Sequence, residues 1–193
     1  MKRILYLFSC ICSFAFILTS VSAEEQLELS GNKNELPEHL VFGIPCDGDL
    51  ILNRKGFSLG YSKKRRQALW VSYILTAEQC ASGKVKRSNT FKMDPAVRYK
   101  PVRPGDYKGS GFDKGHLAPA KDMASSVESM KNSFFMTNIS PQLPGCNRGI
   151  WKRLETQVRR WAVREGKICI ITGPVFKKRN KRMKESRIPI PYA

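Results

Sequence analysis

The chain reads GFDKGHLAPA from Gly111 to Ala120, and this stretch is the most informative part of the sequence. It contains His116, one of only two histidines in the chain. A lone histidine is more often structural than catalytic. Here, however, Gly115 allows the backbone to pass close to a ligand, Lys114 supplies positive charge, and Asp113 can orient a neighbouring group. The pattern therefore predicts a polar site around His116.

Two further motifs lie downstream of this stretch. The chain reads TNISPQ from Thr137 to Gln142 and NRGIWKRLE from Asn147 to Glu155. On a helix, Asn147 and Glu155 lie two turns apart and within ~80° of one another, because each residue advances by about 100°. An amide oxygen and a carboxylate on one face can hold a hard cation, directly or through water. Taken singly, Asn147 also suits a helix N-cap, and Glu155 also suits a solvated surface charge.

Together, the motifs DKGHLAPA, TNISPQ and NxGxWxxLE closely resemble, in order and spacing, the DNA/RNA non-specific endonucleases. These are the ββα-metal, or His-Me finger, nucleases that include endonuclease G. The resemblance extends roughly from Leu40 to Val175. It implies a metal-dependent endonuclease that hydrolyses phosphodiester bonds of DNA and RNA without sequence specificity. The implied cofactor is a single Mg²⁺ ion, with Mn²⁺ as a substitute.

The resemblance also implies roles for individual residues. His116 would be the general base, which suits an imidazole with a pKa of about 6.5. Asn147 would hold the magnesium ion, and Glu155 would support its water shell as a catalytic and metal-site residue. Arg159 would contact phosphate. Lys114 would act in catalysis and substrate binding where the family usually has arginine, so we expect weaker transition-state stabilisation without the bidentate guanidinium.

The patterning predicts an α+β fold with a central antiparallel sheet and a ββα-metal site on one face. Strands are expected at Ile51–Leu52, 57–61, 69–75, 134–139 and 167–175, rich in β-branched and aromatic residues. A basic loop spans 84–111. A helix is expected over 147–165, closed by Gly166, with a core stripe at Ile150, Leu154, Val158, Trp161 and Ala162. Relative to the family, C-terminal strands are expected to be missing after residue 188.

The N-terminus resembles a secretory signal. A basic start at Lys2 and Arg3 precedes an apolar run from Ile4 to Leu18, and small residues at 21–23 offer a cleavage point. The run is short for a membrane anchor, and its exit flank is acidic. We therefore predict a signal peptide at 1–23, a flexible lead-in at 24–39 and an endonuclease domain at 40–193. The protein would be secreted or periplasmic, without stable membrane association after signal removal.

The formal net charge of +18 predicts attraction to a polyanion. Charge alone does not choose among nucleic acid, anionic lipid and acidic polysaccharide, and no pattern fixes an oligomeric state. The resemblance adds DNA and RNA as the expected partners. In an oxidising compartment, the four cysteines outside the signal segment would form disulfides, with three pairings allowed. These cysteines are Cys46, Cys80, Cys146 and Cys169.

Two alternatives remain beside the nuclease. One is a catalytically weak or inactive nucleic-acid-binding protein of the same fold, because of Lys114 or the short C-terminus. The other is a membrane-active basic protein, which would need an amphipathic helix with a wide apolar face. For the enzyme, we expect His116 and Asn147 to face each other across one metal-sized gap.

Overall fold

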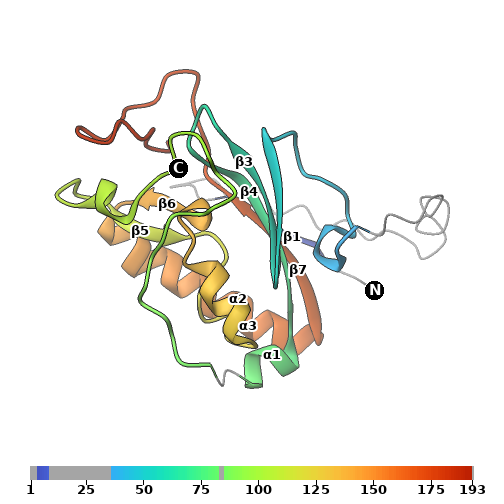
Figure 1. Cartoon of the computed structure of the whole chain (residues 1–193). Helices are drawn as coiled ribbons and strands as arrows, with labels where there is room; N and C mark the ends of the chain where they lie inside the picture. The colour runs from blue at the N-terminus through green and yellow to red at the C-terminus, as the bar shows by residue number, and fades with distance from the viewer. Residues whose placement is uncertain (1–3, 9–35, 83–84, 193) are drawn as a thin grey trace.

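The computed structural model describes residues 4–8, 36–82 and 85–192 (Figure 1). Within them, one five-stranded sheet has the order β1-β7-β4-β3-β2. All neighbours in it are antiparallel except β1 and β7, which are parallel. The predicted α+β fold with a central antiparallel sheet is therefore confirmed. The strands are β1 (Ile4–Phe8), β2 (Leu50–Arg54), β3 (Phe57–Ser62), β4 (Gln67–Thr76) and β7 (Lys167–Gly173).

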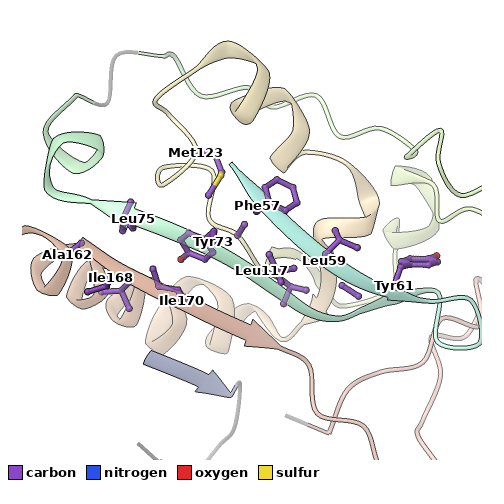
Figure 2. Packing of buried hydrophobic residues seen from close by; sticks show 14 of the residues in the cluster. Phe57, Leu59, Tyr61, Tyr73, Leu75, Leu117, Met123, Ala162, Ile168 and Ile170 are labelled. Atoms are coloured by element: carbon purple, nitrogen blue, oxygen red, sulfur yellow. The ribbon is translucent and has the colours of Figure 1, made fainter. Parts of the chain in front are cut away.

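The main core lies between this sheet and the helices (Figure 2). Strands β3, β4 and β7 contribute Phe57, Tyr73 and Ile170, all at most 2% exposed. Leu117, directly after His116, is 1% exposed and belongs to the same cluster. The chain that follows the DKGH motif is thus anchored in the core, which restricts where His116 can lie.

The helices are short except for one. They are α1 (Ala77–Ser82), α2 (Val127–Ser133) and α3 (Lys152–Glu165). Short 3-10 turns occur at η1 (Glu38–Leu40), η2 (Pro104–Tyr107) and η3 (Met136–Asn138). As predicted, α3 ends at Gly166, which has a φ of 77° that favours glycine.

The start of the predicted 147–165 helix differs from the prediction. Residues Cys146–Trp151 form a π-helical turn, η4, ahead of α3. The wider turn shifts the faces of the chain, so Ile150 is 47% exposed rather than part of the core stripe. Trp151, 5% exposed, is buried in its place. Val158 and Ala162 are buried as the stripe predicted. Single π turns in α-helices are frequent at functional sites.

A second, two-stranded sheet carries the DKGH motif. It pairs β5 (Asp113–His116) with β6 (Ile139–Gln142). The prediction of a strand at 134–139 was wrong, because residues 136–138 form η3 and the strand follows it. Pro141 lies inside β6 opposite Lys114. A proline is tolerated there because an edge strand need not donate every N–H.

Most of the N-terminal predictions lie outside the described residues. Of the expected signal peptide, 1–23, only Ile4–Phe8 is described, as β1 beside β7. Of the lead-in, 24–39, only 36–39 are described. Among the residues described, no helix is both long and apolar enough to cross a membrane. Beyond β7, residues 174–192 contain an isolated bridge between Arg182 and Pro189 and no longer strand.

The expected disulfides are not formed. Cys46, Cys80, Cys146 and Cys169 are all free thiols. They lie in separate places: before β2, in α1, at the start of η4 and in β7. Cys80 Sγ instead faces the backbone carbonyl of Arg159, and Cys169 Sγ faces the hydroxyl of Ser72.

Candidate active site

Strands β5 and β6 and helix α3 build a ββα unit around the motif residues (Figure 1). The register pairs His116 with Ile139 and Gly115 with Ser140. A Cβ on Gly115 would overlap the side chain of Gln142, so any larger residue at this position would force that side chain to move. The close approach that the sequence suggested at Gly115 is therefore to a neighbouring side chain of β6, rather than to a ligand.

Asn138, which is fully buried, fixes the chain after His116. Its amide oxygen accepts the backbone N–H of Ala118 at 2.9 Å. Its amide nitrogen donates to the carbonyls of Ala118 and Ser133 at 3.0 and 2.9 Å. The backbone N–H of Leu117 donates to the Asn138 carbonyl. The asparagine of the TNISPQ motif thus positions the loop that follows the predicted base.

His116 lies between two aromatic rings. Its imidazole centroid is 5.4 Å from that of Phe91 and 4.8 Å from that of Phe134, which it meets edge-on. The residue is 7% exposed, and Nε2 is buried without a hydrogen-bond partner among the described residues. Burial, together with the nearby positive charge of Arg87, lowers the pKa of His116 to about 3. The imidazole is therefore neutral at pH 7, but while it stays buried it is a weak base, because the pKa that suits proton transfer lies near the working pH.

Asn147 is held by the aspartate of the DKGH motif. Its Nδ2 donates to Asp113 Oδ2 at 2.9 Å. Arg148 donates to both carboxylate oxygens of Asp113, from Nε at 2.8 Å and from Nη2 at 2.6 Å. These hydrogen bonds lower the pKa of Asp113, that from Arg148 most. Because the nitrogen end of the Asn147 amide is engaged, its oxygen is the end left for a cation.

Glu155 lines a small pocket with Trp151 and Thr172. Burial, and next the negative charge of Asp122, raise the pKa of Glu155 to about 7, against the opposing effects of Arg159, Arg87 and Trp151. With a pKa of about 7, this carboxyl group is only partly ionised at neutral pH, and a nearby cation would stabilise its charged form. In the described chain, no group of three or more His, Cys, Asp and Glu side chains comes together. A cation here would therefore rely on Asn147, Glu155 and water, a hard oxygen set that suits magnesium.

Arg159 forms an ion pair that the sequence did not indicate. Its Nη1 donates to Asp122 Oδ1 at 2.8 Å, and the hydroxyl of Tyr73 donates to Asp122 Oδ2 at 3.0 Å. The Asp122 side chain is 0% exposed and that of Arg159 is 14% exposed. The guanidinium expected to contact phosphate thus compensates a buried carboxylate, on the same helix face as Glu155.

Lys114 also contacts aromatic rings. Its Nζ lies 5.2 Å from the ring centroid of Phe91 and 5.9 Å from that of Tyr107. Side chains alternate along a strand, so Lys114 and His116 leave β5 on one face, and both contact Phe91. Asp113 leaves β5 on the other face, where it meets Asn147.

His116 and Asn147 therefore do not face each other directly across one gap, as was expected for the enzyme. They approach β5 from opposite faces, and no hydrogen bond joins them in the part of the chain that is described. Arg87 acts on both His116 and Glu155, and sequence reasoning did not single it out. Its guanidinium lies 5.3 Å over the Phe134 ring, and its charge lowers the pKa of both His116 and Glu155. In the sequence, Arg87 is one of many cations in a basic loop, and nothing in the pattern distinguishes it.

Comparison with known proteins gives one consistent result. The sequence model of the family described as DNA/RNA non-specific endonuclease matches residues 37–193. "Nuclease C1" of Cunninghamella echinulata var. echinulata is 36% identical over 142 residues, covering 71% of this chain and 56% of the relative. "Endonuclease G, mitochondrial" of Homo sapiens is 34% identical over 136 residues, covering 70% of this chain and 46% of the relative. The chain spans about half the length of these curated relatives.

A solved structure agrees with the sequence comparisons. The complex of EndoG with EndoGI contains a chain with a TM-score of 0.73 and 26% identity. The match covers 80% of this chain and 68% of that one.

Proposed function

The chain belongs to the DNA/RNA non-specific endonuclease family, and we propose that it is a magnesium-dependent nuclease that cuts both DNA and RNA with His116 as its general base. The observation that carries the proposal is the ββα unit, in which β5 carries His116, the turn η4 carries Asn147 and α3 carries Glu155. No element of this unit is shaped to read base edges, so binding would depend on cations that contact the phosphate backbone.

The proposed roles follow from the contacts. His116, neutral at pH 7, would accept a proton from the attacking water at Nε2, the nitrogen without a partner, once the ring is exposed and its pKa is no longer lowered by burial. Asn147, oriented by Asp113, and Glu155 would hold the metal ion. When bound, magnesium neutralises charge on the scissile phosphate and on the departing 3′-oxygen. Arg87 lies within electrostatic reach of His116 and Glu155, so it binds the non-bridging phosphate oxygens between them.

The burial of His116 adds a step to this scheme. A base that is 7% exposed does not meet water unless the segment that carries Phe91 and Arg87 moves. Substrate phosphate, attracted by Arg87, would draw that segment off the imidazole. We also assign phosphate binding to Lys114. Its ammonium lies over the Phe91 ring and would turn towards phosphate once that ring moves away from His116.

The same burial favours the second candidate, a nucleic-acid-binding protein with weak or no catalysis. In that case Phe91 stays on His116, and the separation of His116 from Asn147 across β5 persists in the complex. We keep the secreted or periplasmic location as a proposal from the N-terminal pattern. The four free thiols add no support for an oxidising compartment.

One experiment separates the two functions. The purified protein is incubated with plasmid DNA and with total RNA, in magnesium and in EDTA, beside His116→Ala and Arg87→Ala. The nuclease is expected to degrade both polymers only with magnesium, and His116→Ala to be about 10²–10⁴-fold slower. Removing Arg87 is expected to cost about 10²–10³-fold, as for other groups that stabilise developing charge. Folded protein that binds both polymers and cuts neither would establish the binding protein instead.

A further inference from the structure

The C-terminal basic run is folded onto the domain. Between Lys181 and Ile190 the chain forms a hairpin, with backbone bonds from Met183 to Ile188 and from Ile190 to Lys181. Met183 and Ile188 are 2% and 0% exposed, so the underside of the hairpin is buried. The basic residues of the hairpin and of the segment just before it are exposed to solvent. The exposed ones are Lys177, Lys178, Arg179, Lys181, Arg182, Lys184 and Arg187.

Two arginines in the turn between β3 and β4 hold this hairpin next to another basic segment. Arg65 Nη1 donates to Asn180 Oδ1 at 2.9 Å. Arg66 Nη1 donates to the Ser186 carbonyl at 2.8 Å, and its Nε donates to the Lys100 carbonyl at 3.1 Å. The turn, the 98–103 segment and the C-terminal run therefore form one surface, which we call the basic platform (Figure 1). It consists of residues 63–66, 98–103 and 177–187.

The platform concentrates positive charge with little to balance it. Glu185 is the only acidic residue within its three segments, and Lys63, Lys64, Arg98, Lys100 and Arg103 add exposed cations. Like charges held this close by a folded backbone repel one another, which destabilises the free protein unless a polyanion binds. Two exposed aromatic rings accompany the charges: Tyr99 in the platform is 69% exposed, and Tyr192 just beyond it is 60% exposed. Nucleic-acid surfaces combine cations with such rings, on which bases stack.

The platform lies against the catalytic unit. The apolar cluster under the hairpin joins Met183 and Ile188 to Met136 and Ile139. Ile139 is the β6 partner of His116. Phe91, packed on the same cluster, contacts the imidazole. The platform and His116 therefore border one and the same apolar cluster.

We propose that the basic platform is a second binding surface for the phosphate backbone of a long nucleic-acid strand whose scissile phosphate lies at His116. This rests on the proposed nuclease function. Its chemistry is sequence-blind and salt-sensitive, since each phosphate contact releases a counterion. The exposed tyrosines and the neighbouring phosphodiester site favour nucleic acid over an acidic polysaccharide. The platform would matter for long strands and be irrelevant to substrates too short to span both surfaces.

The test compares two fourfold variants of the full protein. The platform variant carries Lys178→Gln, Arg179→Gln, Lys181→Gln and Lys184→Gln, whose side chains form no hydrogen bond or ion pair with another described residue. The control variant carries Lys55→Gln, Lys131→Gln, Arg153→Gln and Arg160→Gln, equally exposed cations elsewhere. Binding of a labelled 30-nucleotide strand is measured by anisotropy over a salt series, in the His116→Ala background so that the strand stays intact. Cleavage of 30- and 4-nucleotide substrates is measured with His116 present.

In the platform variant, log K is expected to fall less steeply with log salt. The magnitude of the slope should decrease by about 3, at about 0.7–0.9 per lost phosphate contact. The variant's kcat/KM on the long substrate should fall at least about tenfold relative to the control variant, with the short substrate unaffected. Equal slopes in the two variants, or equal losses on long and short substrates, would overturn the platform while leaving the nuclease intact. Platform-dependent binding without cleavage of either substrate would overturn the nuclease and keep the platform. Loss of heparin binding with DNA binding retained would assign the surface to polysaccharide.

Discussion

At the scale of single residues, burial acts on the two ionisable groups of the site in opposite directions. It lowers the pKa of His116 to about 3 and raises that of Glu155 to about 7, because both lose the hydration of their charged forms. The result at neutral pH is an uncharged imidazole and, separately, a carboxyl group close to its own titration point. Neither side chain carries a full charge that would need a permanent partner.

The buried imidazole should make the protein sensitive to acid. In the unfolded chain His116 has a pKa of about 6.5, and in the folded chain it is about 3. Between these values the unfolded state binds the proton, so stability falls as pH falls from about 6.5 towards 3. The slope is up to about 1.4 kcal/mol per pH unit for one group. Urea unfolding in EDTA at pH 4 to 8 should therefore show a weaker pH dependence for His116→Asn than for the wild type. A matched His39→Asn variant should keep the His116 contribution, and identical slopes for the wild type and His116→Asn would refute the assignment.

Asp113 should act on the metal through Asn147. Asp113 accepts a hydrogen bond from Asn147 Nδ2 at 2.9 Å, so replacing Asp113 with Ala frees the Asn147 amide. Removing a partner that orients a metal ligand typically lowers metal affinity or activity by about 10–100-fold. We therefore expect the magnesium concentration for half-maximal cleavage to rise by about 10–100-fold, with nucleic-acid affinity in EDTA unchanged. Arg148→Ala removes the other partner of Asp113 and leaves Asn147 held. If both variants shift the magnesium requirement alike, Asp113 is not the orienting group.

At the scale of elements, what the sequence predicts depends on how local the determinant is. Strands β3 and β4 and the end of α3 at Gly166 follow from runs of aromatic and aliphatic residues and from one glycine, and they lie where expected. The π turn η4 is set by packing of Trp151 against the core, so periodicity placed Ile150 inside instead. Strand β6 begins only after Asn138 has used its side chain to hold the loop at Ala118, a contact between residues far apart in sequence.

The candidate site divides in the same way. Asp113, His116, Asn147 and Glu155 are recognisable because they recur in a motif with fixed spacing. Arg87 and the partner of Arg159 are not, because their roles depend on which loop folds over Phe134 and on a buried carboxylate. Sequence reasoning thus identifies the proposed catalytic groups more readily than the groups that set their environment.

Pairing of β5 with β6 should depend on Gly115 having no side chain. An added Cβ would overlap the Gln142 side chain, and Gly115 is buried within the strand. Gly115→Ala is therefore expected to cost about 1–3 kcal/mol of unfolding free energy, the usual range for overpacking. Urea unfolding measures this loss. Gly149→Ala is the matched control, because a Cβ there meets nothing within 4 Å. Combining Gly115→Ala with Gln142→Ala should recover most of the loss, and no recovery would show that strain lies elsewhere.

At the scale of the whole molecule, one buried carboxylate connects three parts of the fold. Asp122 follows the catalytic motif, Tyr73 belongs to β4 and Arg159 belongs to α3. Burial raises the pKa of Asp122, and the opposing charge of Arg159 and the hydrogen bonds to it reduce that effect. The loop after β5, the central sheet and the helix of the site are thereby held in one arrangement. This makes Arg159 a structural cation first, whatever it does for the substrate.

Replacing Arg159 separates that structural role from phosphate binding. Arg159→Gln leaves the Asp122 carboxylate buried without its cation, which is expected to cost about 3–5 kcal/mol of unfolding free energy. The double variant Arg159→Gln, Asp122→Asn removes the uncompensated charge and should regain most of that stability. Urea unfolding gives both values, and kcat/KM per folded molecule is measured beside it. A structural Arg159 predicts that the double variant recovers activity together with stability. A phosphate-binding Arg159 predicts that stability returns while kcat/KM stays low, because no second substitution restores a missing contact to the substrate.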